Sequence, residues 1–178
     1  MDSLYSRYAN ALFSIALEEN KVEFYKNEIK MLRQVILQND EILHLFSSCF
    51  IQKEDKEKII DEVFKNQDIN IINFLKVIVN NKRTNCLIKI FDEFIKTCNE
   101  NLNVKEGIVY SITKLDKKQV EEIEKALKVR LNCEVELVNL IDERLLGGVK
   151  VVIEDKIFDG SIKNKLEKLK SSLISGGN

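Results

Sequence analysis

The chain has no proline and no tryptophan, and it has one histidine among its 178 residues. Without proline, no ring interrupts a helical hydrogen-bond ladder, so long continuous helices are permitted. The single histidine, His44, has no accompanying Ser, Cys or Asp pattern that would orient it as a base. We therefore interpret His44 as a half-buried packing residue, and we expect no catalytic residue in the chain.

Metal and cofactor motifs are also missing. The four cysteines are widely spaced and form no Cys-x-x-Cys pair, and one histidine offers little as a further zinc ligand. Neither a Gly-x-Gly-x-x-Gly nor a Gly-Lys-Ser/Thr phosphate loop is present. The sequence therefore predicts no metal site and no cofactor.

Charge and hydropathy argue against two further classes of protein, those that bind nucleic acid and those that span a membrane. The 28 basic and 29 acidic residues give a net charge of −1, and neither half of the chain is a polycation, which disfavours nucleic-acid binding. No apolar run approaches the ~18 residues that span a bilayer, and no leader-like segment opens the chain. We expect a protein of the reducing cytoplasm with free thiols.

The first part of the chain is patterned for helices. Apolar residues recur at helical spacing in six segments, near residues 3–19, 21–38, 42–46, 52–64, 69–79 and 84–102. Short polar loops separate these segments, which predicts a six-helix antiparallel bundle.

The first and fifth of these helices are apolar over much more than one stripe. Such a helix is either central in its bundle or forms half of a groove for an incoming apolar helix. If the groove exists, the residues that we expect to border it are Tyr8, Leu12, Phe74, Leu75 and Ile78.

Near Asn103 the hydrophobic period changes from 3.6 to 2, which predicts a domain boundary between residues 1–103 and 104–178. Ile108, Tyr110 and Ile112 alternate as one strand, and residues 133–140 as another. Between these strands, Asp116 and Gln119 have the spacing of a capping box. Strand, helix, strand, hairpin and helix predict a small α/β domain with a mixed sheet, and the whole chain is of the α+β class.

The stretch 142–160 predicts the hairpin. Val149, Val151 and Ile153 share one face, and the polar residues 154–156 make the turn. Gly147 and Gly148 indicate a bend or a close backbone approach, which we favour over a ligand loop. After the hairpin, Asp159 or Ser161 can cap a helix that we expect to lie on the sheet through Ile162, Leu166, Leu169 and Leu173.

Three separate segments carry a resemblance to a known family. They are residues 7–16, residues 73–94 with Asn73, Phe74 and the run 81–83, and residues 141–161 with the run 146–149 and Asp159. Together they resemble the delta subunit of the bacterial F-type ATP synthase, the counterpart of the mitochondrial oligomycin-sensitivity-conferring protein. The resemblance covers nearly the whole chain, although the prolines common in that family's bundle loops are missing.

The resemblance implies a non-catalytic stator subunit of the peripheral stalk. Such a subunit links the catalytic head to the proton-translocating membrane sector through the b subunits, so that rotor torque drives ATP synthesis. The helical domain would bind the amino-terminal helix of an alpha subunit. The smaller domain would meet the carboxy-terminal end of the b-subunit stalk near Gly147, Gly148, Leu166, Leu169 and Leu173.

The implied location is peripheral, on the cytoplasmic face of the bacterial cell membrane, without nucleic acid. Three alternatives stay open from the residues alone. They are a helical protein-interaction adaptor of another complex, a nucleic-acid-binding α/β module and a small enzyme.

Overall fold

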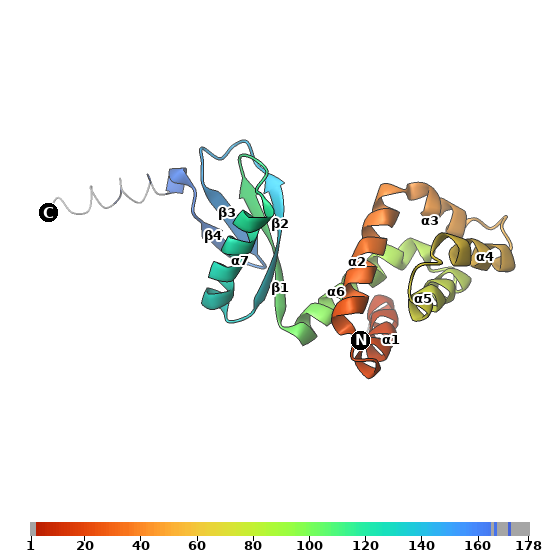
Figure 1. Cartoon of the computed structure of the whole chain (residues 1–178). Helices are drawn as coiled ribbons and strands as arrows, with labels where there is room; N and C mark the ends of the chain where they lie inside the picture. The colour runs from red at the N-terminus through yellow and green to blue at the C-terminus, as the bar shows by residue number, and fades with distance from the viewer. Residues whose placement is uncertain (1–2, 165, 167–170, 172–178) are drawn as a thin grey trace. The chain divides into compact units, whose positions relative to one another are not determined.

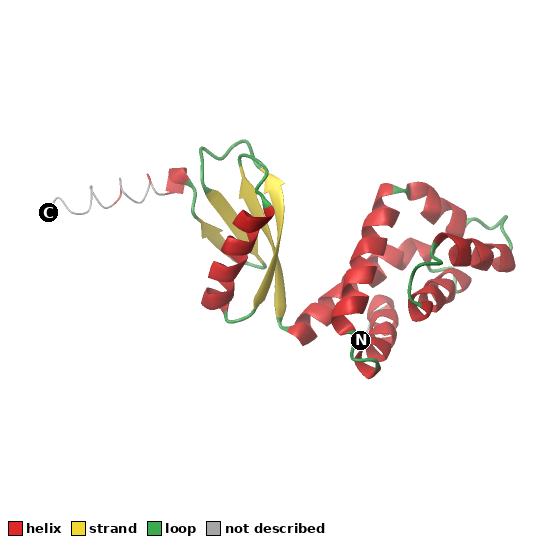
Figure 2. Ribbon diagram, viewed as in Figure 1, coloured by secondary structure: helices red, strands yellow, loops and turns green. Residues whose placement is uncertain are grey.

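The computed structural model describes residues 3–164, 166 and 171. The fold is α+β, with helices alone in the first part of the chain and a small mixed sheet in the second (Figures 1 and 2). The chain divides into two compact units, Met1–Asn101 and Leu102–Asn178.

The first unit is built from helices at the six predicted segments. The sixth segment begins with a short 3-10 helix before its α-helix, which the apolar pattern did not indicate. In order, the elements are α1 (Leu4–Glu18), α2 (Val22–Gln38), α3 (Asp40–Ser47), α4 (Lys53–Val63), α5 (Ile69–Asn80), η1 (Thr84–Cys86) and α6 (Leu87–Leu102).

Two helices of the first unit bury the face that their spacing predicts. On α2, the residues at helical spacing from Val22 to Ile36 are all buried, including Tyr25, Ile29 and Leu32. On α6, Phe91 and Phe94 are fully buried. Burial of apolar side chains of this size contributes about 1.5–3 kcal/mol each, so these faces supply most of what holds the unit together.

A polar network fixes the end of α1 against the start of α5. The Tyr25 hydroxyl donates to Glu19 at 3.0 Å and to Asp68 at 3.2 Å, and the Asn70 amide donates to that hydroxyl at 2.9 Å. Asp68 also caps α5, because its carboxylate accepts from the Asn70 backbone N–H at 2.8 Å. The two helices that define the site are therefore held at this end by specific hydrogen bonds.

The second unit contains a four-stranded sheet in the order β2-β1-β3-β4. Its strands are β1 (Val104–Ser111), β2 (Glu134–Ile141), β3 (Val149–Ile153) and β4 (Lys156–Asp159). β1 is parallel to β2 and antiparallel to β3, and β3 and β4 form the predicted hairpin. The helix α7 (Lys117–Leu131) joins β1 to β2 and covers one face of the sheet (Figure 2).

The predicted capping box begins α7. The Asp116 carboxylate accepts from the Gln119 N–H at 2.8 Å, and the Gln119 side chain accepts from the Asp116 N–H at 3.0 Å. One strand boundary was predicted wrongly, since Ile112 lies beyond the end of β1. The Ser111 hydroxyl donates to the Thr113 carbonyl at 2.7 Å, which turns the chain there.

The register leaves an apolar row on the face of the sheet opposite α7. Val109, Val151 and Ile153 point toward α7 and are buried with Leu127. Their neighbours along the strands point the other way because side chains alternate. Ile108 pairs with Val138 and with Val152, and Val152 pairs with Ile157, so four aliphatic side chains form one row.

Candidate functional site

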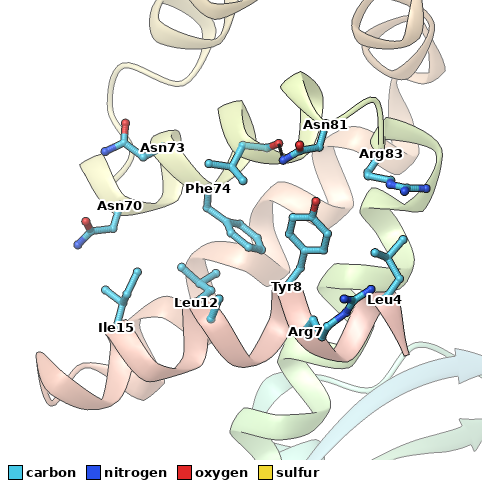
Figure 3. Close-up of a pocket in the computed structure, with 12 residues that line it drawn as sticks. Leu4, Arg7, Tyr8, Leu12, Ile15, Asn70, Asn73, Phe74, Asn81 and Arg83 are labelled. Atoms are coloured by element: carbon cyan, nitrogen blue, oxygen red, sulfur yellow. Dashed lines mark hydrogen bonds between the residues drawn. The ribbon is translucent and has the colours of Figure 1, made fainter. Parts of the chain in front are cut away.

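An open groove of about 760 Å³ lies between α1 and α5 (Figure 3). The two helices run in opposite directions along it, so Leu4 and Arg83 lie at one end and Ile15 and Asn70 at the other. Its lining is apolar at the floor and polar at the rims. The lining residues are Leu4, Arg7, Tyr8, Ala11, Leu12, Ile15, Asn70, Asn73, Phe74, Val77, Asn81 and Arg83.

Three of the five residues predicted for a helix-binding site line this groove. Tyr8, Leu12 and Phe74 point into the space between the two helices (Figure 3). Leu12 and Phe74 are buried by their neighbours and form the floor, whereas the Tyr8 ring is half-buried. The wide apolar arc of the first helix is thus shared between the core and the groove.

The other two predicted residues, Leu75 and Ile78, do not line the groove. They are 1% and 0% exposed and pack in the core of the first unit, so their predicted position at its border needs correction. The physical reason is that most positions of α5 are apolar, so the spacing of its apolar residues alone does not separate the core side from the groove side.

Ala11, Ile15 and Val77 also line the groove although they were not predicted there, and Val77 is 48% exposed. A signal for the groove side of α5 was nevertheless present. Asn70, Asn73 and Asn81 recur at helical spacing with Phe74 and Val77, and polar residues of this kind mark the face that meets water.

The polar rim is uneven in charge. Asn81 donates to the Val77 carbonyl at 2.8 Å, and Asn70 donates to Glu19 at 2.8 Å. Hydrogen bonds from Lys21 and Tyr25 lower the pKa of Glu19, so this carboxylate stays ionised, and the ion pair with Lys21 balances its charge. Arg7 and Arg83, at the other end, are exposed and form no ion pair with another described residue.

The lone histidine is exposed on α3, so the predicted half-buried packing role of His44 is wrong. Phe46 is the buried side chain of α3, and a residue two positions away on a helix points about 200° from it.

Among the described residues, no group of three or more His, Cys, Asp or Glu side chains could hold a metal ion. The groove has the composition of a surface that binds an apolar partner.

In the second unit, Gly147 and Gly148 lie where two backbone segments approach closely. Gly148 has φ +77°, and a Cβ there would be 2.5 Å from the Gly160 carbonyl oxygen. The Gly160 N–H donates to Val149 at 2.9 Å, and the Ile162 N–H donates to Gly147 at 3.0 Å. These contacts explain why glycine occupies positions 147 and 148, the glycine step: the chain entering β3 packs closely there against the chain leaving β4.

The Ile162 side chain lies against Gly147, and apolar residues on both sides of this contact are exposed among the described residues. Leu146, Ile162 and Leu166 are all exposed. Ser161 begins the next helical segment, because its hydroxyl accepts from the Asn164 N–H at 3.3 Å. Two further residues predicted for the stalk contact, Leu169 and Leu173, lie outside the described residues, as does most of the helix expected to lie on the sheet.

An exposed groove with an apolar floor and polar rims is the kind of surface that receives an amphipathic helix of another protein. Comparison with known proteins makes this specific. The model of the ATP synthase delta (OSCP) subunit family matches residues 4–173. The chain belongs to this family.

Relatives match over almost their full length. The chain is 40% identical to the ATP synthase subunit delta of Mycoplasma mobile over 168 residues, which cover 94% of this chain and 93% of that protein. It is 35% identical to the ATP synthase subunit delta of Bacillus cereus over 169 residues, which cover 94% of each.

A solved structure shares the fold. The match is to a chain in the cryo-EM structure of the Toxoplasma gondii mitochondrial ATP synthase hexamer, with a TM-score of 0.66 and 21% identity over 97% of this chain and 98% of that one. Family membership makes the chain a non-catalytic stator subunit of an F-type ATP synthase, a peripheral part of a membrane-bound complex. Within the described residues, no helix is long and apolar enough to cross a membrane.

Proposed function

We propose that the groove between α1 and α5 receives the amino-terminal helix of an alpha subunit, so that residues 1–103 attach the chain to the catalytic head. In this proposal the six helices of that region form an antiparallel bundle. Residues 104–178 meet the carboxy-terminal end of the b-subunit stalk. The assembled complex places the chain on the cytoplasmic face of the bacterial cell membrane.

The shape and lining of the groove carry the proposal. A groove with an apolar floor and polar rims accepts the apolar face of an amphipathic helix, with anchors at i, i+3 or i+4, and i+7. The groove extends along α1 from Leu4 to Ile15, which at 1.5 Å per residue is about 16 Å, or three turns of an incoming helix. Tyr8, Ile15 and Val77 keep exposed surface in the groove above the buried floor, and they supply the aromatic and aliphatic surface on which such contacts depend.

A stator must resist torque, and this requirement fits a joint of this kind. Buried apolar anchors inside a polar rim exclude water and dissociate slowly. The network of Tyr25, Glu19, Asp68 and Asn70 holds α1 and α5 together before the partner arrives. A groove that is already formed spends little binding free energy on ordering itself.

Titration calorimetry with a synthetic peptide of the alpha-subunit amino terminus tests the groove. Val77→Asp places a charge on the exposed groove side of α5, and we expect it to weaken binding by at least tenfold with the fold retained. Val35→Asp is the matched control, because Val35 is 43% exposed in the middle of α2 and does not line the groove. Equal affinity of both variants for the peptide would place the alpha-subunit contact elsewhere.

For the stalk contact, the supporting observation is the exposed apolar group at Leu146, Ile162 and Leu166, held by the glycine step at residues 147–148. The aliphatic row on the face of the sheet opposite α7 adds apolar surface to the same unit. We expect Leu146→Asp to weaken binding of a soluble b-subunit carboxy-terminal fragment. Val129→Asp, at an exposed position on α7, is the control, and its equal effect would argue against this location.

A further inference from the structure

Two arginines give the groove a charged end. Arg7 comes from the first turns of α1 and Arg83 from the segment that follows α5, and both lie at the Leu4 end of the groove (Figure 3). They are the charged members of the described lining, which contains no carboxylate. Both are exposed, and neither forms an ion pair with another described residue.

We infer that Arg7 and Arg83 form a carboxylate clamp, so that the groove selects an amphipathic helix carrying an Asp or Glu at one end of its apolar stripe. This inference rests on the proposed function and adds a charge requirement to it. The two guanidinium groups present fixed forks of N–H donors, which match a carboxylate better than a lysine ammonium does.

The backbone does not supply this charge preference by itself. The amino-terminal end of α1 and the carboxy-terminal end of α5 lie together at this end of the groove, so their helix dipoles oppose each other. The arginine side chains therefore set the local potential. The opposite end is lined by Asn70 and Asn73, whose amides are neutral, and so the groove distinguishes one end of its occupant from the other.

The size of the effect follows from the exposure of the two arginines. An exposed ion pair contributes about 0.2–1 kcal/mol, which corresponds to roughly a 1.5- to 5-fold change in affinity for each arginine. We expect Arg7→Gln and Arg83→Gln each to weaken binding of the alpha-subunit peptide by roughly 2- to 5-fold at low ionic strength. The double variant should weaken it by roughly tenfold, and high salt should reduce the difference.

The test is a double-mutant cycle read by fluorescence anisotropy, with the labelled alpha-subunit peptide and versions in which each acidic residue is replaced by its amide. In the unaltered chain, replacing one acidic residue near an end of the peptide's apolar stripe should lower the affinity. The same replacement should have no effect on affinity when both arginines of the chain have been replaced. The position that couples also shows which way the helix lies in the groove. Lys82→Gln is the matched control, since Lys82 is exposed beside Arg83 but does not line the groove.

The outcomes separate the two claims. No binding of the peptide to the unaltered chain would overturn the proposed function. Tight binding that is equal in the arginine variants and in Lys82→Gln would overturn the clamp and leave the helix-binding function standing. A salt-sensitive loss that appears with Arg7→Gln and Arg83→Gln, and that couples to one carboxylate, supports the clamp.

Discussion

Replacing Gly148 with alanine should destabilise the second unit and leave the first unit intact. The residue combines φ +77° with a Cβ position 2.5 Å from the Gly160 carbonyl oxygen and 3.0 Å from the Ser161 Cα. The obstructing atoms are backbone, so no side-chain rotation can relieve the contact. The segment that follows β4 would have to move away from the start of β3.

Two costs set the magnitude. A residue with a side chain held in the left-handed region loses about 1–2 kcal/mol relative to glycine. Overpacking that forces the backbone to shift adds about 1–3 kcal/mol. A total loss of at least roughly 2 kcal/mol in the free energy of unfolding would lower the melting temperature of a unit of this size by roughly 8–16 °C.

Hydrogen exchange with mass spectrometry reads the two units separately. For Gly148→Ala we expect faster exchange in β1 to β4 and unchanged exchange in α1 to α6. Gly160→Ala is the matched control, because its Cβ would meet only the Val149 carbonyl oxygen, at 3.2 Å, and its φ lies outside the range that side chains resist. If Gly148→Ala exchanged no faster than Gly160→Ala, the account of the glycine step would be refuted.

Three further outcomes follow from burial. Ile78→Asp should unfold the first unit, since a carboxylate at a fully buried site costs several kcal/mol, and circular dichroism would detect the loss of helix. Burial raises the pKa of the Cys98 thiol to about 12, so a thiol reagent should modify exposed Cys49 rapidly and Cys98 only after unfolding. Burial also raises the pKa of Tyr25 from 10.0 to about 12, so the stability that its neutral form contributes is present below pH 10.0 and lost as the pH rises through about 12. Unfolding of Tyr25→Phe across this range should lack that loss.

Local chemistry made much of the fold predictable. Asp116 and Gln119 mark the start of α7 through a reciprocal pair of hydrogen bonds that spans only four positions of the chain. The alternation at Val149, Val151 and Ile153 indicates both the hairpin and the face that meets α7. Such signals need no knowledge of the rest of the chain, and therefore they can be read from the sequence.

The groove could be predicted only in part, because it depends on how two distant helices meet. Tyr8, Leu12 and Phe74 were found from apolar excess, but Leu75 and Ile78 share that property and serve the core instead. On a helix whose positions are mostly apolar, the partner on each side is decided by tertiary packing.

The charged end of the groove was missed for the same reason. Arg7 and Arg83 are far apart along the chain, and they share one end of the groove because α1 and α5 run in opposite directions. A pattern confined to one segment of sequence contains no information about that juxtaposition.

The most direct test of the central claim is to titrate the isotopically labelled chain with the alpha-subunit amino-terminal peptide and follow backbone amide shifts by NMR. We expect saturable perturbations that cluster on α1 and α5 around Leu12, Phe74 and Val77, with residues 104–160 unaffected. Perturbations confined to the second unit, or no binding by the intact chain, would contradict it.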